Sequence, residues 1–574
     1  SFLINTRFTD WLNFDLEYAI ESVDNRRLDY TSNKTWTGGG TREELFATYS
    51  TGNFYQSSYR NTSQKLQATL NFNQEIIEDL SLTAKLSYLL ENSDYYQFDA
   101  YGYNAVVSGR TISLDNYSDS QISSNAANEV TNNFFAIAGL DYKDRYILDG
   151  MYRRDESSLF GSNFRTNDYY RVSGAYRISQ DFDIPGVQEL KVHAAMGTAG
   201  QRPSYAWQYT RRNIGSGIPS TSQTVGNPEL RPSKSTEKEV GLNADFLDRF
   251  SLEVVYSDMK TEDQFMLVDL FAPANEGANQ YQNVGTVTSN TLELVLDAEI
   301  VNTKDFSWNT GIVFSSTNNT IESLNINPRI QGPGDGQMFR LEEGLEYGTM
   351  FGRDFVRSLD IMAAQLPSGA SLSDYVVNSD GVVVDASTIG TKYESGIIRE
   401  NEDGSVWVGD IGNQTADFNL GLRNTISYKN FDFYMLWDWK QGGDLYNRNG
   451  QWLTRDNRHE MIDQAGKALG EQKTVSYYQS LYDVNQNNGY WVEDASFVKL
   501  REASIFYTFD DMEKSFINSL RIGLTGTNLF TFTNYSGWDP EVQLFDGATS
   551  QYYAVDFGVY PVSTSYTLSV TLKF

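Results

Sequence analysis

The sequence contains few of the side chains that usually carry out catalysis or bind transition metals. It has two histidines, His193 and His459, and no cysteine, which argues against histidine-rich and cysteine-based metal centres and excludes a disulfide framework. His459-Glu460 begins like the metal-binding helix of a zinc protease, but the second histidine of that motif is missing. A Gly-x-Ser-x-Gly nucleophile elbow is also missing. These residues predict a protein that is not an enzyme.

Acidic residues dominate the charge of the chain. There are 75 Asp and Glu against 45 Lys and Arg, which gives a formal net charge of −30. This excess argues against nucleic acid as a partner, because phosphate contacts need Lys and Arg. Two acidic segments, 400–404 and 378–381, could hold Ca²⁺ loosely, but they lack the full EF-hand spacing and favour simple turns. We therefore predict no cofactor, with loosely bound Ca²⁺ in acidic loops as the one alternative.

The side chains best suited to bind a ligand are aromatic ones in predicted loops. Flat indole and phenol faces stack on the C–H faces of sugar rings, while the polar atom hydrogen-bonds a hydroxyl or a peptide group. The same rings could instead pack loop against loop or anchor to lipid headgroups. The candidate substrate-binding residues are Tyr205, Trp207, Tyr209, Trp407, Trp452, Trp491 and Trp538.

The elements that must position these rings are strands in which polar and apolar residues alternate, with no helical segments evident. No run of apolar residues is long enough for a membrane-spanning helix, which needs about 18 or more. Alternating strands along the whole chain fit a β-barrel in lipid, where one face of each strand meets hydrocarbon and the other meets water. The last strand is the clearest, and we predict that its apolar face closes the barrel and signals its assembly. That face consists of Tyr566, Leu568, Val570, Leu572 and Phe574.

The connections between predicted strands alternate between very short and very long. Tight periplasmic turns and long external loops give this parity in outer-membrane barrels, whereas a soluble sandwich gives no reason for it. The short connections lie at 76–79, 143–145, 246–249, 302–305 and 429–430. The long ones lie at about 93–130, 200–234, 261–287, 318–414, 441–493 and 529–563.

The predicted fold is all-β, a transmembrane antiparallel β-barrel with about 17 strands over residues 1–574. The segment 318–414 is predicted to be a long extracellular loop insertion. Single-chain bacterial barrels have an even number of strands and close on themselves, so an odd count leads us to expect further strands before residue 1.

Four groups of motifs identify the family that the chain resembles. They lie at 141–161 with 176–179, at 225–232 with 235–241, at 417–433 with 442–446, and at 495–504 with 526–530, 539–541 and 560–561. In this combination and order they are similar to the SusC/RagA group of TonB-dependent outer-membrane transporters of the Bacteroidetes. The resemblance covers about 130–574 well and the first hundred residues loosely.

The resemblance implies a 22-stranded barrel in the bacterial outer membrane, with a plug domain that the sequence does not contain. It implies import of oligosaccharides, or alternatively of oligopeptides, with energy from TonB–ExbB–ExbD acting through the plug. A SusD-like surface lipoprotein would cap the barrel, and pairs of transporter and lipoprotein could dimerise. The 318–414 loop is the best candidate for contact with that lipoprotein.

Two readings from other classes remain open. A passive porin or secretion pore would need neither plug nor lipoprotein. A soluble or surface-attached glycan-binding β protein would leave the membrane without detergent, but the terminal Phe574 and the alternating loop lengths weigh against it.

Overall fold

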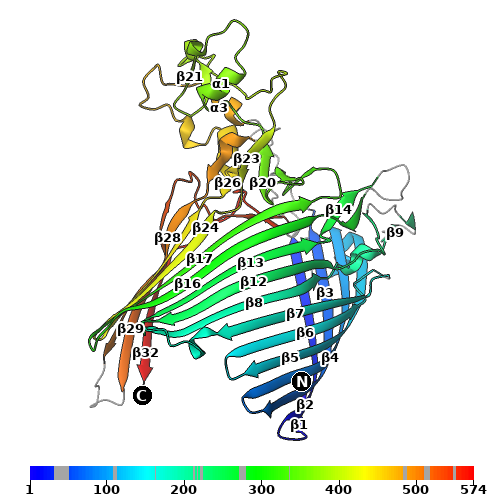
Figure 1. Ribbon diagram of the computed structural model, residues 1–574. Helices are drawn as coiled ribbons and strands as arrows, with labels where there is room; N and C mark the ends of the chain where they lie inside the picture. Colours follow the sequence, from blue (N-terminus) through cyan, green and yellow to red (C-terminus); the bar gives the residue numbers. More distant parts are fainter. Residues whose placement is uncertain are drawn as a thin grey trace. The chain divides into compact units, whose positions relative to one another are not determined.

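A computed structural model describes residues 1–31, 51–107, 113–161, 163–210, 214–215, 218–219, 224–270, 279–334, 337–482, 488–509, 518–546 and 551–573. A 17-stranded antiparallel sheet dominates the fold (Figure 1), which confirms the predicted all-β class and strand count. Its strands are β1 (Phe2–Arg7), β2 (Leu12–Thr31), β3 (Asn53–Ile77), β4 (Leu80–Ala105), β5 (Tyr117–Tyr142), β6 (Tyr146–Ser157), β7 (Thr166–Arg177), β8 (Val187–Gln201), β12 (Ser233–Phe246), β13 (Phe250–Glu262), β16 (Thr286–Asn302), β17 (Phe306–Ser323), β24 (Phe418–Tyr428), β25 (Phe431–Gln441), β28 (Phe497–Phe509), β29 (Ser519–Thr533) and β32 (Ser565–Lys573).

The chain divides into two compact units. Unit 1 comprises Ser1–Ala175, Ala195–Thr236 and Asp263–Asn283, and unit 2 comprises Tyr176–Ala194, Glu237–Glu262 and Val284–Phe574. In unit 1, the strands β1 to β6 pair in chain order. In unit 2, the strands β13, β16, β17, β24, β25, β28, β29 and β32 also pair in chain order. Each strand therefore lies beside its sequence neighbour in the sheet, as expected for strands joined by hairpins.

Alternation gives each strand pair an apolar face and a polar face. In the β3–β4 pair, Leu66 lies opposite Leu90 and Leu70 opposite Leu86. On the other face, Lys65 lies opposite Glu91 and Thr69 opposite Ser87. Leu70 and Leu86 are exposed although they are apolar. A broad apolar face that no protein covers is stable only against lipid.

The last strand follows the same rule. β32 pairs with β29, so that Leu568 lies opposite Leu524 and Val570 opposite Ile522 on the apolar face. Tyr566 and Leu568 of this face are 71% and 72% exposed, respectively. The predicted alternation is confirmed, whereas roles in closure and assembly stay predictions. Phe574 lies outside the described residues.

Short turns join the strands at one end of the sheet, as predicted. All five predicted short connections separate consecutive strands: β3 and β4, β5 and β6, β12 and β13, β16 and β17, and β24 and β25. Four of them contain residues with positive φ, such as Asp79 at 65° and Lys429 at 52°. Turns with positive φ match the right-handed twist of the flanking strands, which explains why they close tight hairpins.

Five of the six predicted long connections also separate strands, but the one at 93–130 is wrong. β4 continues to Ala105 and β5 starts at Tyr117, and the two strands stay paired from Leu80 opposite Tyr142 to Ala105 opposite Tyr117. Polar residues lie on both faces here, since no face has to meet hydrocarbon beyond the lipid-crossing part of the strands. The period-2 apolar signal therefore disappears although the strands continue.

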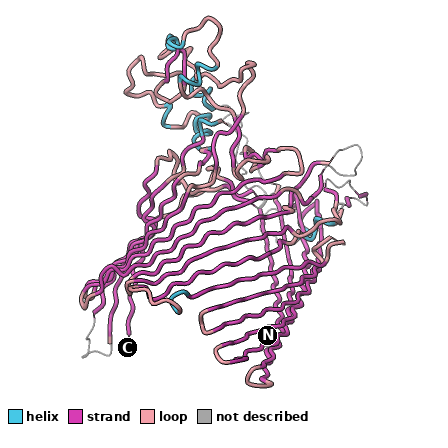
Figure 2. The backbone as a smooth tube through the Cα atoms, viewed as in Figure 1, coloured by secondary structure: helices cyan, strands magenta, loops and turns pink. Residues whose placement is uncertain are grey.

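The long connections contain small sheets and short helices (Figure 2). The described residues contain three α-helices, which the sequence did not reveal and which lie in unit 2: α1 (Leu359–Ala364), α2 (Arg448–Arg455) and α3 (Val475–Tyr482). Among the described residues, every helix is too short or too polar to cross a membrane. The small strands are β9 (Ile214–Gly215), β10 (Ile218–Pro219), β11 (Thr224–Val225), β14 (Phe265–Asp269), β15 (Asn279–Asn283), β18 (Arg329–Gln331), β19 (Phe339–Leu341), β20 (Thr349–Gly352), β21 (Tyr375–Val377), β22 (Val383–Asp385), β23 (Gly409–Asn413), β26 (Asp444–Tyr446), β27 (Val492–Asp494), β30 (Leu544–Asp546) and β31 (Gln551–Tyr553).

The best-buried apolar residues of unit 2 lie in its loops. One cluster draws residues from 318–414, 441–493 and 529–563 together. The long loop at 318–414 therefore shares a core with the two other loops of unit 2. The cluster contains Met338, Phe339, Met350, Leu445, Tyr446, Trp491, Ala495, Tyr535, Val542, Tyr553, Ala554 and Val555.

Candidate functional site

Two surfaces carry the candidate functional side chains. The first is the set of three loops in unit 2 at 318–414, 441–493 and 529–563, which we call the loop assembly. The second is the polar face of the sheet in unit 1. Each loop of the assembly starts and ends at a strand of the sheet, so the alternating strands position both surfaces.

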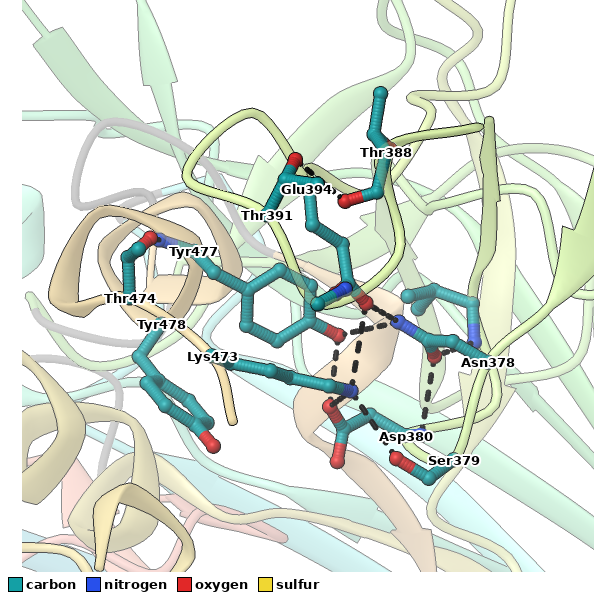
Figure 3. Close-up of polar contacts among 12 residues, drawn as sticks. Asn378, Ser379, Asp380, Thr388, Thr391, Glu394, Lys473, Thr474, Tyr477 and Tyr478 are labelled. Atoms are coloured by element: carbon teal, nitrogen blue, oxygen red, sulfur yellow. Dashed lines mark hydrogen bonds and ion pairs between the residues drawn. The ribbon is translucent and has the colours of Figure 1, made fainter. Parts of the chain in front are cut away.

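A buried polar cluster fastens two loops of the assembly together (Figure 3). We call it the polar latch, and it consists of Lys473, Asp380, Glu394, Tyr477 and Asn378. The Lys473 ammonium forms an ion pair with Asp380 and lies 3.7 Å from Glu394 Oε1. The side chains of Lys473 and Glu394 are only 6% and 1% exposed. Charges this deeply buried are tolerated because they are paired.

Neutral groups complete the polar latch. The Tyr477 hydroxyl donates to Asp380 Oδ2 at 2.8 Å, and Asn378 Nδ2 donates to Glu394 Oε1 at 3.0 Å and to the Tyr477 hydroxyl at 2.9 Å. Burial and the neighbouring Asp380 carboxylate raise the pKa of Tyr477. The latch joins the 318–414 loop to helix α3 of the 441–493 loop, where Tyr477 and Tyr478 also pack on Val382 and Val384.

A second ion cluster fastens the 529–563 loop to the sheet. Lys499 Nζ on β28 lies 2.7 Å from Asp539 Oδ1 and also pairs with Glu541. Arg501 on the same strand donates to Glu541 Oε2 at 2.6 Å and to Asp438 of β25 at 2.9 Å. Two of the family motifs, 495–504 and 539–541, therefore meet in space. The contact between these two motifs consists of ion pairs.

Electrostatics stabilise this second cluster. Burial alone would raise the pKa of Asp539 and of Glu541, but hydrogen bonds from Lys499 and Arg501 outweigh it and hold both pKa values below their ordinary range. The backbone N–H groups of Glu541 and Val562 add to the effect at Asp539, at 3.1 and 3.2 Å. Asp539 thus ties the carboxyl-terminal end of its own loop, at Val562, to the middle of that loop.

The predicted aromatic residues of unit 1 pack chiefly against other loop residues. The Trp207 ring is stacked on Tyr281 with 4.0 Å between centroids and contacts the edge of Phe265 at 5.4 Å. Tyr205 lies 5.4 Å from Tyr209, whose side chain is exposed. Tyr209 is thus the most accessible of the three, and Trp207 joins the 200–234 loop to β14 and β15.

The predicted tryptophans of unit 2 divide into packed and open rings. Trp491 is 3% exposed, and its Nε1 donates to the Leu481 carbonyl at 2.9 Å, so we leave it out of the substrate surface. Trp407 and Trp452 are half-buried, each with a guanidinium 3.9 Å from its ring centroid, from Arg399 and Arg455. Trp538 is 78% exposed and is the most open of the four.

The polar face of β3 and β4 carries a tyrosine-rich surface that the sequence analysis does not predict, because the half of it on β4 lies in the segment 93–130, which is predicted to be a loop. We call it the tyrosine wall, and it consists of Tyr55, Tyr59, Tyr95 and Tyr101 with Gln97 and Asp99. Tyr55 and Tyr101 are stacked with centroids 4.7 Å apart, and Tyr59 lies 5.9 Å from Tyr95. Tyrosines at even spacing on two adjacent strands were the available signal, since aromatic residues favour strands.

Metal ligands do not gather in the part of the chain that the structure describes, since no three His, Asp or Glu side chains meet as a metal site would require. The two acidic segments are turns in which side-chain oxygens accept backbone N–H groups. Asp403 accepts from Ser405 at 2.9 Å, and Asn378 accepts from Asp380 at 3.0 Å. Loose Ca²⁺ binding stays a prediction.

Paired strands with an exposed apolar face, tight turns at one end and folded loops at the other define an outer-membrane β-barrel protein. The family model described as TonB dependent receptor-like, beta-barrel, matches residues 2–387. The chain belongs to this family.

Relatives agree with this assignment. The chain is 26% identical over 553 residues to TonB-dependent receptor P26 of Formosa agariphila, covering 88% of this chain and 52% of that protein. It is 23% identical over 597 residues to TonB-dependent receptor SusC of Bacteroides thetaiotaomicron, covering 98% of this chain and 55% of that protein. The chain thus spans about half the length of the curated relatives it matches.

Solved structures agree on the fold. The chain is similar to a chain in the structure of the RagAB peptide transporter, with a TM-score of 0.76 at 19% identity, covering 99% of this chain and 61% of that one. The outer membrane transporter YddB from Escherichia coli follows with a TM-score of 0.51 at 10% identity, covering 100% of this chain and 62% of that one. The predicted resemblance to the SusC/RagA group is confirmed, and the fold is that of a bacterial outer-membrane barrel.

Proposed function

We propose that the whole protein is an active importer in the bacterial outer membrane that takes up oligosaccharides. The match to the TonB-dependent receptor-like β-barrel family over residues 2–387 carries the proposal. Energy would come from TonB–ExbB–ExbD, acting through a plug domain of the whole protein. No catalytic step is part of the proposal.

A SusD-like surface lipoprotein is the proposed partner at the outer loops. Support comes from the loop assembly, in which three loops share one core and are fastened by the polar latch and by the Lys499–Asp539 pair. A rigid platform of this kind suits a hinged lid, because docking then costs little ordering of the loops. We also propose that two pairs of transporter and lipoprotein form a dimer.

The lipoprotein contact can be tested without disturbing the shared core. Deleting 318–414 would remove core residues such as Met350, so we prefer substitutions of its exposed residue Tyr393 and of Leu469 in the neighbouring loop. Tyr393→Asp with Leu469→Asp should reduce co-purification of the lipoprotein in mild detergent. Lys573→Asp at the far end of β32 is the matched control. Undiminished co-purification in the double variant would refute the loop assembly as the contact.

Cargo and energy coupling are tested together by uptake into whole cells. Labelled neutral oligosaccharides and oligopeptides are offered to cells with and without the gene, in strains with and without TonB. The proposal expects oligosaccharide uptake that requires both genes. Uptake of peptides alone would shift the cargo to the oligopeptide alternative, and uptake that persists without TonB would favour a passive pore. A bilayer recording distinguishes the last case, since a passive pore stays open whereas a plugged transporter stays closed.

A further inference from the structure

The tyrosine wall lies on strand segments that extend beyond the lipid. A tilted strand crosses the hydrocarbon core in about 9 to 11 residues, whereas β3 has 25 residues and β4 has 26. Counted from their shared turn at 78–79, Tyr59 and Tyr95 are more than fifteen residues up their strands. The tyrosine wall therefore belongs to the water-exposed part of the sheet.

The side chains of the tyrosine wall share the polar face. The β3–β4 register runs unbroken from Glu75 opposite Ser81 to Asn53 opposite Tyr103, so every odd-numbered residue of this stretch points to one side. Tyr55 and Tyr59 thus face the same way as Lys65. This is the face turned away from lipid.

The rings of the tyrosine wall are held in place by polar neighbours. Gln97 Nε2 donates to both Asp99 oxygens, at 3.0 and 2.9 Å, and the Tyr55 hydroxyl donates to Asp99 Oδ1 at 3.1 Å. The Tyr95 hydroxyl donates to Gln97. All four rings are half-buried, so part of each stays accessible, and the hydroxyls of Tyr55 and Tyr95 are fixed by these hydrogen bonds. Pre-oriented rings lose little entropy when a ligand binds.

The neighbouring strand adds small hydrogen-bonding groups. On β5, Ser123 lies opposite Asp99, Asn125 opposite Gln97 and Ala127 opposite Tyr95. Ser123 and Asn125 are exposed. Ala127 leaves the side of Tyr95 uncrowded. The surface thus combines flat apolar rings with amide and hydroxyl groups at their edges.

Charge on this surface favours an uncharged ligand. Asp99 accepts hydrogen bonds from the neutral groups of Gln97 and Tyr55, which hold its pKa below the ordinary value and keep it ionised at neutral pH. The nearby Arg27 lies 5.8 Å over the Tyr55 ring, but it already forms an ion pair with Asp29 at 2.7 Å. An anionic ligand would meet an uncompensated carboxylate.

The backbone disfavours an extended peptide here. β3 and β4 are paired on both sides, with β2 and with β5, so their N–H and C=O groups are used in the sheet and cannot add a peptide strand. Recognition has to come from rings and side chains. Sugar rings offer C–H faces for stacking and hydroxyls for the amide and carboxylate groups.

We propose that the tyrosine wall is a binding subsite for neutral oligosaccharides, in which Tyr55, Tyr59, Tyr95 and Tyr101 stack on sugar rings. The Gln97 amide exchanges hydrogen bonds with the sugar hydroxyls, and the Asp99 carboxylate accepts hydrogen bonds from them. The proposal rests on the proposed function and names the substrate class and its contact residues.

Binding to the purified full-length protein in detergent tests the subsite. The probes are neutral gluco-, xylo- and manno-oligosaccharides of about six units, a length that would span several rings, measured by calorimetry. Tyr55→Ala with Tyr101→Ala should weaken binding of the best probe about tenfold or more, whereas Phe at both positions should retain most of it. Tyr96→Ala is the matched control, because Tyr96 is exposed on the opposite face of the same strand.

Substitution of Asp99 tests the preference for uncharged ligands. Asp99→Asn should change the affinity for the neutral probe by less than about threefold and should improve binding of an oligouronate of the same length. Equal loss in Tyr96→Ala and in the Tyr55/Tyr101 variant, or no loss in the latter, would overturn the subsite.

Failure of the subsite differs from failure of the proposed function. TonB-dependent saccharide uptake that is unchanged in the tyrosine variants refutes the subsite alone. A wild-type protein that neither binds nor imports any saccharide refutes the oligosaccharide cargo and the subsite with it. Peptide import that the tyrosine variants weaken refutes the ligand class assigned to the tyrosine wall. Heat-modifiable migration of each variant on gels verifies that the barrel has folded.

Discussion

Replacing Lys473 by Met should open the polar latch. The substitution removes the only ammonium group that the structure places between Asp380 and Glu394 and keeps a side chain of similar length. Removing one partner of a buried ion pair costs about 3 to 5 kcal/mol, because the remaining charge is buried without compensation. The two carboxylates left behind also repel each other.

The size of this cost sets the size of the expected effect. A loss of about 3 to 5 kcal/mol corresponds to an open population that is larger by a factor of roughly a hundred to several thousand.

Hydrogen exchange followed by mass spectrometry measures the open population directly. Peptides covering 375–394 and 475–482 should exchange at least about a hundredfold faster in Lys473→Met at pH 7. The control is Lys392→Met on the same loop, where the ammonium is exposed and lies 5.0 Å from the Tyr393 ring. Adding Glu394→Gln to Lys473→Met should restore part of the protection. Exchange in Lys473→Met equal to that in the control would refute the ion pair as the fastening of these loops.

Three further perturbations test other parts of the structure. Leu568→Arg on the lipid face of β32 should cost about 2 to 4 kcal/mol and reduce the heat-modifiable barrel in membranes, whereas Ser569→Arg on the polar face should not; equal loss in both would contradict the assigned faces. Gly161→Ala should loosen the loops after β6 and β8, since the added Cβ would collide with a backbone carbonyl of the opposing loop, and unchanged protease resistance there would speak against this contact. The pKa values of Asp539 and Glu541 are lowered, so their contribution to stability is complete above the ordinary carboxyl pKa of about 4 and is lost as the pH falls through the lowered values. Cleavage of the 529–563 loop by an acid-active protease should therefore rise between about pH 4 and pH 2. A cleavage rate that does not change with pH would argue against the ion cluster.

The lipid-crossing part of the sheet could be predicted from the sequence for a physical reason. A strand in a membrane must present one apolar face, so alternation as in 566–573 marks both the strand and the side chains that meet lipid. Tight turns such as 143–145 and 429–430 follow from the same hairpin geometry. The family motifs identified the barrel because they occur together and in the order that is typical of the family.

The sequence alone could not show where strands continue beyond the lipid. In β4, residues after about position 92 are polar, aromatic or small on both faces, because no apolar face has to meet lipid there. The tyrosine wall depends on this continuation. Its four rings come together only because β3 and β4 keep their register far above the turn.

Contacts among the loops were decided by the tertiary structure alone. Lys473 meets Asp380 across 93 residues of sequence, and Lys499 meets Asp539 across 40. Neither ion pair can be predicted from the sequence, because each Lys or Arg could pair with any of the 75 acidic residues. The sequence also cannot distinguish one loop tryptophan from another. In the structure, Trp491 is buried in the loop core, whereas Trp538 is exposed to solvent. The sequence determined which segments are strands in lipid, since hydrocarbon imposes a local pattern, whereas packing between distant loops decided which polar and aromatic groups are free to bind.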